Sequence, residues 1–252
     1  PSLFAYIAQR RDLDAMARRV PVIANLFPGG DRLMEDFHYA GGLPALMNVI
    51  RAHLSLDEIT VTGEPLRAQL EGRAVLDPQV ILAPDHPVSP RPALAVLRGN
   101  LAPDGAVIKP SAASPELMRH RGRAIVFDSP PEMNAALSDP AFDCDETCVI
   151  VLRNAGPVGG PGMPEWGNLP IPRKLLQRGV RDLVRISDAR MSGTHYGTCV
   201  LHVSPESAVG GPLALVRNGD TIELDVEARA PNLLVDDAEL ARLKALIAEH
   251  RS

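Results

Sequence analysis

Several residue types are scarce in this sequence, and each shortage argues against a class of protein. Only 3 of the 252 residues are cysteine, a small and odd number that does not suit a disulfide scaffold and favours a reducing, cytoplasmic environment. Aromatic residues make up 4% of the chain and the net charge is −5, so no nucleic-acid partner is expected. No apolar run approaches the roughly 20 residues that span a membrane, so no membrane segment is expected.

The rest of the composition is that of an ordinary globular protein with one domain or slightly more. Hydrophobic residues make up 45% of the chain, enough at this length for a sizeable core. Apolar residues at helical spacing predict helices over residues 12–20 and 41–54. A segment between them is rich in proline and glycine, and is either a shaped loop or a plain connector. Its polar residues include Asp31, Glu35, Asp36 and His38.

From about residue 72 onward, the sequence changes to short runs of β-type residues. Asn218-Gly219 divides the last of these runs, which predicts a β-hairpin with a type I′ turn. Helical patterns interrupt or follow the strands. Together these patterns predict a mixed α/β fold whose second part is a barrel or sandwich with flanking helices. The β-type runs cover residues 93–97, 105–109, 123–127, 147–152, 182–186, 198–203 and 213–226, and the helical patterns cover residues 114–122, 172–180 and 236–250.

A glycine-rich stretch, NAGPVGGPGMPEWGN, follows a predicted strand at residues 154–168. It lacks the G-K-[S/T] ending of a P-loop and does not fit G-x-G-x-x-G, which argues against a nucleotide site. Backbone without side chains does let another molecule approach closely. Glu165 lies near the end of this stretch. It is either a solvated surface carboxylate or an oxygen ligand for a hard cation such as Mg²⁺.

The stretch RISDARMSGTHYGT, residues 185–198, places many reactive groups where a predicted strand ends. Ser192, His195 and Asp188 are the residue types of a catalytic triad. They lie too close in sequence for the usual triads, whose members come from separate elements, and RMSGT is not a nucleophile elbow. Each of these three residues also has an interpretation that involves no catalysis. Asp188 can cap the turn and pair with Arg190, His195 can pack or face solvent, and Ser192 can bond to nearby backbone.

The three cysteines do not form a pattern typical of a metal site. Cys144 and Cys148 are spaced as C-x₃-C, without a second pair or a histidine at zinc spacing. Cys148 and Cys199 lie inside predicted strands. We therefore expect these cysteines to be small buried side chains rather than metal or cluster ligands.

Five longer motifs occur along the chain. They are MEDFHYAGGLPA at 34–45, LRGNLAPDGAVIKPSAAS at 97–114, GGPGMPE at 159–165, SDARMSGT at 187–194 and HVSPESAVGGPLALVRNGD at 202–220. Together, and in this order, they resemble the dihydroxy-acid and sugar-acid dehydratase family over nearly the whole chain. MPEWGNLPIPRKLL at 163–176 and the KPSAAS segment resemble the branch that acts on aldonic acids, such as the pentonates arabinonate and xylonate.

The resemblance implies a two-domain hydro-lyase. In this family an N-terminal α/β domain carries an iron–sulfur cluster on three cysteines and most of the Mg²⁺ ligands, and a C-terminal swivelling β-barrel closes over the site. Residues 1–72 would be the helical end of the first domain and residues 73–252 the barrel. By match to the motifs, Glu165 would be a Mg²⁺ ligand, Ser192 the catalytic base working as an alkoxide, and Thr194 a residue beside the substrate.

The chain departs from the family because the cluster cysteines and the upstream Mg²⁺ ligands are absent from it. The resemblance therefore implies the C-terminal part of a larger, homo-oligomeric enzyme, inactive without its cluster-bearing domain. The implied reaction removes the C2 proton and the C3 hydroxyl of a 2,3-dihydroxy sugar acid and gives a 2-keto-3-deoxy acid. Two alternatives remain open: a dihydroxy-acid dehydratase of branched-chain amino acid synthesis, and a non-catalytic binding or assembly module.

Overall fold

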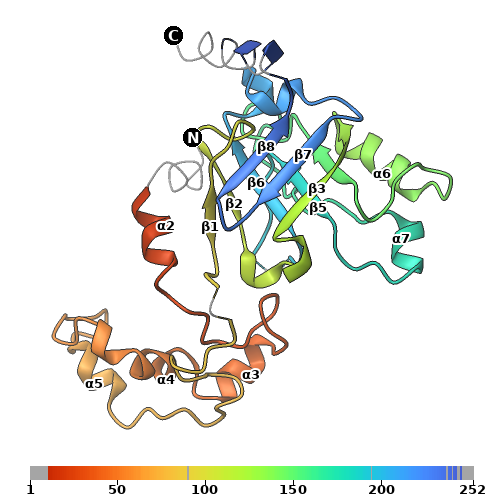
Figure 1. Ribbon diagram of the computed structural model, residues 1–252. Coiled ribbons are helices and arrows are strands. Elements are labelled where there is room, and N and C mark those ends of the chain that lie inside the picture. The colour runs from red at the N-terminus through yellow and green to blue at the C-terminus, as the bar shows by residue number, and fades with distance from the viewer. Residues whose placement is uncertain are drawn as a thin grey trace.

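The computed structural model describes residues 11–89, 91–193 and 195–236, and residues 238, 239, 241, 242 and 245 near the C-terminus. In Figure 1 a group of short helices lies below an eight-stranded sheet. None of the helices in the described part of the chain is long and apolar enough to cross a membrane. The helices predicted at residues 12–20 and 41–54 are confirmed, although they end earlier than predicted. The first helices are α2 (Arg11–Ala17), α3 (Met34–Tyr39), α4 (Gly42–Val49) and α5 (Leu66–Leu70), with a 3₁₀ turn at Arg51–His53.

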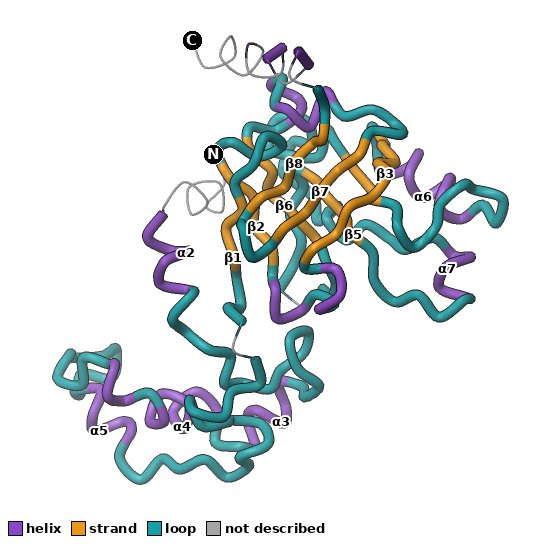
Figure 2. Tube along the Cα trace, viewed as in Figure 1, coloured by secondary structure: helices purple, strands orange, loops and turns teal. Residues whose placement is uncertain are grey.

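The sheet has the strand order β1-β2-β6-β5-β4-β3-β7-β8. Strands β3, β4, β5 and β6 run parallel, and the remaining neighbours pair antiparallel. Figure 2 shows these strands in orange as one strongly curved sheet. Their bounds are β1 (Ala95–Leu97), β2 (Gly105–Ile108), β3 (Arg119–Phe127), β4 (Val149–Leu152), β5 (Val184–Ser187), β6 (Cys199–Ser204), β7 (Thr221–Asp225) and β8 (Ala230–Leu234).

The two edges of the sheet are joined by the segment that follows β1. The N–H of Arg98 donates to the carbonyl of Arg229 at 2.6 Å. Asn100 donates through Nδ2 to the carbonyl of Leu233 at 2.8 Å, and its Oδ1 accepts from the N–H of Leu233 at 2.7 Å. The side-chain amide of Asn100 thus makes the two hydrogen bonds to Leu233 that the backbone of a neighbouring strand would otherwise make. These contacts close the sheet and cover its edges, which confirms the predicted mixed α/β fold with a C-terminal barrel.

Helices cross over between the parallel strands, as parallel pairing requires. Helix α6 (Pro130–Ser138) connects β3 to β4, and α7 (Arg173–Gln177) connects β4 to β5. Every residue of β4 and β5 is buried, as is typical of strands covered on both faces. Val151 belongs to the apolar cluster that fills the barrel. Its neighbour Ile150 belongs to a second cluster with Leu175 of α7. The two faces of the parallel strands therefore support two separate cores.

The hairpin predicted at Asn218-Gly219 is wrong. The residues before it, Pro212–Leu215, form a 3₁₀ helix, and β7 pairs with β8 and β3 instead. Of the two turn residues only Gly219 has a positive φ, 94°, whereas a type I′ turn needs two. Asn218 Oδ1 accepts a hydrogen bond from the N–H of Val126 at 2.7 Å. The asparagine therefore fastens this turn to β3.

The helix predicted at residues 114–122 is also wrong. Within it, Pro115–Leu117 form a 3₁₀ turn. Residues 119–122 instead begin β3, in which the five residues from Arg119 to Arg123 pair with β7. Gly122 belongs to that strand, where an added Cβ would lie 1.9 Å from the carbonyl oxygen of Thr147. The helix predicted at 172–180 is confirmed as α7 and is followed by Gly179 with φ 90°. The helix predicted at residues 236–250 lies mostly outside the described residues.

Candidate active site

The candidate residues lie on two loops at the carboxyl ends of neighbouring parallel strands. Strand β4 leads into residues 153–168, called here the Glu165 loop, and β5 leads into residues 188–198, the Ser192 loop. Carboxyl ends of adjacent parallel strands meet at one edge of a sheet, so the fold brings the two loops together. The sequence placed Ser192 at the end of a strand, whereas in the structure β5 ends at Ser187 and Ser192 lies in the loop that follows.

Arg190 joins the two loops. Its Nη1 lies 2.8 Å from Oε1 of Glu165, and the two side chains are 41% and 44% exposed. Its carbonyl accepts a hydrogen bond from the N–H of Gly167 at 2.7 Å. The expectation that Arg190 pairs with Asp188 is therefore wrong, because Arg190 crosses to the other loop. The ion pair holds Glu165 at the rim of the barrel, near the loop that carries the serine.

Asp188 is buried and holds the base of the Ser192 loop. Its Oδ1 accepts from the N–H of Ala155 at 2.9 Å, and its Oδ2 accepts from the N–H of Ser207 at 2.8 Å and from the Ser207 hydroxyl. These contacts tie together the segments that follow β4, β5 and β6. Asp188 is thus a structural acceptor rather than the third member of a triad with His195.

Ser192 and His195 lie side by side within one loop. The Oγ of Ser192 is 2.9 Å from Nδ1 of His195, which is hydrogen-bonding distance, and both residues are half-buried. An imidazole nitrogen without a proton is a good acceptor for a hydroxyl. The Ser-His part of the arrangement considered from the sequence is therefore present, without the aspartate.

Lys109, the residue after β2, holds the Ser192 loop from a distant part of the chain. Its Nζ donates to the carbonyls of Ser192 at 3.2 Å, Gly193 at 3.1 Å and His195 at 2.9 Å. Burial lowers the pKa of Lys109. Sequence reasoning missed this residue because 83 positions separate it from Ser192. Its place in the KPSAAS motif was the one signal that could have drawn attention to it.

A buried ion pair supports the same loop. Nη2 of Arg185 lies 2.9 Å from Oδ1 of Asp182, and the two side chains are only 4% and 3% exposed. Asp182 also accepts from the Thr198 hydroxyl at 2.7 Å and from the N–H of Ser114 at 3.1 Å. Arg185 donates through Nη1 to the carbonyl of Leu169 at 2.9 Å. The pair therefore fastens the end of the Ser192 loop to neighbouring segments, and the sequence analysis did not identify it.

The glycines of the Glu165 loop surround a carboxylate of the protein itself. Glu206 accepts hydrogen bonds from the N–H of Val158 at 2.9 Å and of Gly159 at 3.2 Å. A Cβ at Gly156 would lie 2.3 Å from Glu206 Oε2. The close approach expected for this backbone is thus made by an internal side chain.

A cavity of about 390 Å³ lies beside the Ser192 loop. His195 and Tyr196 line it, and two cationic side chains reach it. The rest of the lining is largely apolar, and Glu165 does not belong to it. The lining residues are Phe27, Asn168, Leu169, Pro170, Ile171, Leu176, Arg181, Arg185, His195 and Tyr196.

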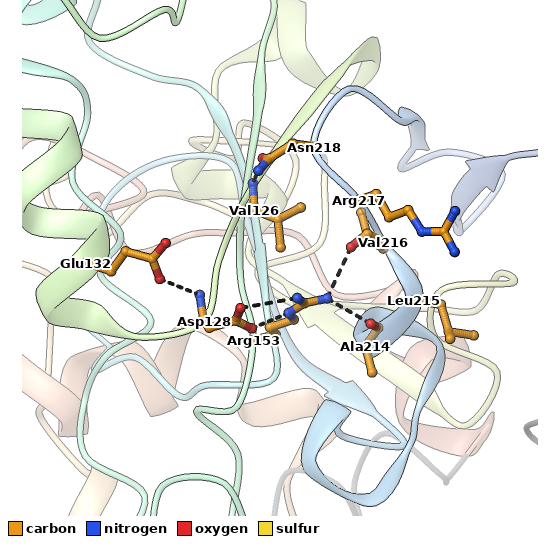
Figure 3. Close-up of a pocket in the computed structure, with 9 residues that line it drawn as sticks. All are labelled: Val126, Asp128, Glu132, Arg153, Ala214, Leu215, Val216, Arg217 and Asn218. Carbon is orange, nitrogen blue, oxygen red and sulfur yellow. Dashed lines mark hydrogen bonds and ion pairs between the residues drawn. The ribbon is translucent and has the colours of Figure 1, made fainter.

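A second cavity of about 390 Å³, shown in Figure 3, lies where β3 and β4 end. Its lining is polar, and the side chains of Asp128, Glu132 and Arg153 are bound within the protein. Arg153 donates to the carbonyl of Ala214 at 2.8 Å and pairs with Asp128. Glu132 accepts from the N–H of Asp128 at 3.1 Å. This arrangement stabilises the fold and contains none of the predicted site residues.

The predicted cofactors fit this chain to different degrees. In the described part of the chain, no three or more histidine, cysteine, aspartate or glutamate side chains lie close enough together to hold a metal ion. Glu165 offers one rim carboxylate, which suits Mg²⁺ when water, substrate or another part of the protein supplies further oxygens. Thr194, predicted to lie beside the substrate, is outside the described residues.

The cysteines do not fit an iron–sulfur cluster. Cys144, Cys148 and Cys199 are free and buried. Burial raises the pKa of Cys144 to about 12 and also raises the pKa of Cys199. All three lie in one apolar cluster, and no group of three metal-ligating side chains occurs in the described residues, so they serve as small core side chains, as the sequence predicted.

The fold and the site define a barrel domain that carries polar side chains on loops at one end of its parallel strands. The chain belongs to the dihydroxy-acid/6-phosphogluconate dehydratase family. The family's C-terminal model matches residues 79–251 and its N-terminal model matches residues 5–69. The resemblance seen in the motifs is therefore confirmed, whereas the domain boundary at residue 72 stays a prediction.

Three relatives illustrate the range of similarity. The chain is 55% identical to a 6-deoxy-6-sulfo-D-gluconate dehydratase from Pseudomonas putida, over 95% of the chain and 43% of the relative. It is 51% identical to an L-arabinonate dehydratase from Rhizobium leguminosarum bv. trifolii, over 92% and 40%. It is 42% identical to a dihydroxy-acid dehydratase from Methanoregula boonei, over 93% and 42%. The chain thus spans about two fifths of the length of these relatives.

Proposed function

We propose that this chain is the C-terminal part of a hydro-lyase that dehydrates a sugar acid to a 2-keto-3-deoxy acid. The observation that carries the proposal is the Arg190–Glu165 ion pair, which sets the Ser192 loop beside a rim carboxylate. Identities of 55% and 51% to two sugar-acid dehydratases, against 42% to a dihydroxy-acid dehydratase, support a sugar acid as the substrate.

In the proposed reaction, Ser192 takes the proton from C2 of the substrate, and Thr194 would be a residue that binds the substrate. The C3 hydroxyl leaves, and the resulting enol tautomerises to the 2-keto-3-deoxy acid. Glu165 would help to hold Mg²⁺, which when bound stabilises negative charge on the substrate's carboxylate and 2-hydroxyl oxygens. The buried thiols of this chain do not fit an iron–sulfur cluster, so we place that cluster in the upstream domain of a larger, homo-oligomeric enzyme. The three free thiols support a cytoplasmic location.

Exposed apolar side chains along the first part of the chain support an upstream domain as partner. The side chains that lie largely in solvent include Phe27 at 52%, Met34 at 67%, Tyr39 at 69% and Leu43 at 58% exposure. Large apolar side chains gathered on one exposed segment are typical of an interaction surface. We propose that the cluster-bearing domain covers them, and that the chain alone does not catalyse the reaction.

A second candidate function is the dehydration of a branched, apolar dihydroxy acid. The apolar lining of the cavity beside His195 favours it, because an apolar pocket discriminates in favour of an alkyl side chain. A non-catalytic binding module is a third possibility.

A dehydratase assay tests these alternatives. The chain alone and the chain extended by its upstream region would be supplied with iron, sulfide and Mg²⁺. Each would be offered pentonates, hexonates, 6-deoxy-6-sulfogluconate and a branched dihydroxy acid, and the 2-keto product would be measured. We expect product from the extended protein with a sugar acid and none from the chain alone. Preference for the branched acid would favour the second candidate, and binding without turnover by either protein would favour the third.

We expect Glu165→Gln in the extended protein to raise the Mg²⁺ concentration needed for half-maximal activity by at least about tenfold. The amide keeps the size of the side chain but removes the negative charge that a hard cation prefers. A Mg²⁺ titration of activity measures this shift. Glu223→Gln, on a strand remote from the loops, is the matched control and should leave the titration unchanged. An unaltered titration for Glu165→Gln would remove this residue from the metal site.

A further inference from the structure

The proposed reaction requires that the Ser192 hydroxyl give up its own proton. Serine is a poor base unless a neighbouring group accepts that proton or a cation stabilises the alkoxide. Glu165 does not perform this role, because its Oε1 is paired with Arg190 at 2.8 Å. A proton acceptor in direct contact with Oγ would meet the requirement within this chain.

His195 is such an acceptor. Its Nδ1 lies 2.9 Å from Ser192 Oγ, within the 2.6–3.2 Å range expected for a general base and its proton donor. If the hydroxyl donates, Nδ1 carries no proton and the ring proton lies on Nε2. This tautomer is the one that allows the serine proton to move to the ring.

Lys109 fixes the geometry of the pair. One ammonium group binds the carbonyl of Ser192 at 3.2 Å and the carbonyl of His195 at 2.9 Å, so both members are held from one point. Three carbonyls take up its three N–H donors, which leaves none to compete for Nδ1. Lys109, which follows β2, thus holds Ser192 and His195 in place from outside their loop.

The imidazole also borders a space that water can enter. His195 lines the cavity of about 390 Å³ beside the Ser192 loop. The other charged or titratable groups around the ring are Lys109 after β2, Arg181 on the segment before β5, Arg185 within β5, and Tyr196 of the same loop. Arg185 is neutralised by Asp182. A proton that reaches the ring can therefore pass to water in the cavity.

We propose, on the basis of the proposed function, that His195 is a positioning residue that orients Ser192 and accepts its hydroxyl proton. The substrate's C2–H bond breaks, its electron pair stays with the substrate, and its proton bonds to Ser192 Oγ. The former hydroxyl proton moves at the same time to His195 Nδ1, which becomes an imidazolium. The ring then loses one proton to water, and the hydroxide that leaves C3 takes up one proton and departs as water.

The first test is nitrogen-15 NMR of the 252-residue chain labelled at histidine, with His195→Gln used to assign the signal. We expect the neutral His195 ring to carry its proton on Nε2, and its Nδ1 resonance to move when Ser192 is replaced in Ser192→Ala. His86→Ala is the matched control, because His86 lies on an exposed loop, and it should leave that resonance in place. A proton on Nδ1, or no response to Ser192→Ala, would overturn the proposal.

The second test uses the extended, cluster-loaded protein. We expect His195→Ala to lower kcat by about 10²-fold or more with little change in KM, and to remove one limb of the pH–rate profile. His195→Asn retains a hydrogen-bonding atom near the position of Nδ1 but cannot accept a proton, so it should stay slow. Recovery to near-normal kcat in His195→Asn would show that orientation alone matters and would overturn the proton transfer. His86→Ala should match the unaltered enzyme.

The two tests also separate this inference from the proposed function. If the unaltered extended protein turned over no sugar acid, the dehydratase proposal would fail. The NMR experiment would still decide whether Ser192 donates its proton to His195, because it needs neither cluster nor substrate.

Discussion

Asp182→Ala is expected to lower the free energy of unfolding by about 3–5 kcal/mol, the range found when one partner of a buried ion pair is removed. The carboxylate and Arg185 are each less than 5% exposed, so the guanidinium would be left charged and without its partner in the interior. The N–H and hydroxyl of Thr198 and the N–H of Ser114 would also lose their acceptor. Urea unfolding followed by circular dichroism measures the change.

Asp143→Ala is the matched control, because Asp143 pairs with Arg123 at the surface. Those side chains are 89% and 43% exposed, so its removal should change the free energy of unfolding by no more than about 1 kcal/mol. The double variant Asp182→Leu with Arg185→Leu should recover part of the loss, since no charge is then left buried. A loss below about 1 kcal/mol for Asp182→Ala would show that water reaches Arg185, contrary to the packing described here.

The barrel strands could be predicted from the sequence because their signal is local. The runs at residues 105–109, 147–152 and 182–186 each correspond to a strand whose ends differ from the prediction by no more than two residues. The run at residues 147–152 is nearly continuous in apolar residues, because β4 is covered on both faces. The same local pattern placed Ser192 at a strand end, and the structure has it in the loop that follows β5.

Contacts between distant segments could not be predicted in this way. Lys109 reaches the Ser192 loop only because β2 pairs with β6, and no pattern near either residue encodes that pairing. The false hairpin at Asn218-Gly219 has the same cause. A local turn signal was present, but the side chain of Asn218 binds the N–H of Val126 in β3, the strand that pairs with β7. Local propensity favours certain conformations for a segment, and pairing with distant segments decides which of these conformations forms.

Replacing the proposed base should have the largest effect on activity. In the extended, cluster-loaded protein, Ser192→Ala is expected to lower kcat by at least about 10²–10⁴-fold, the contribution of a positioned general base. Turnover of a sugar acid at saturating Mg²⁺ measures this loss. Ser138→Ala is the control, because Ser138 ends α6 and its hydroxyl only donates to the carbonyl of Asn134. It should keep full activity.

Stability should change little in Ser192→Ala, which separates a catalytic loss from an unfolded protein. The residue is half-buried, and the loss of its hydrogen bond to His195 should cost about 0.5–1.5 kcal/mol. The loop would remain fastened by Lys109, whose contacts are to backbone carbonyls that alanine retains. An inactive variant with a nearly normal melting temperature is therefore the expected result. Near-normal turnover would mean that another group removes the C2 proton, and the contacts of Lys109 with the carbonyls of Ser192 and His195 would then be purely structural.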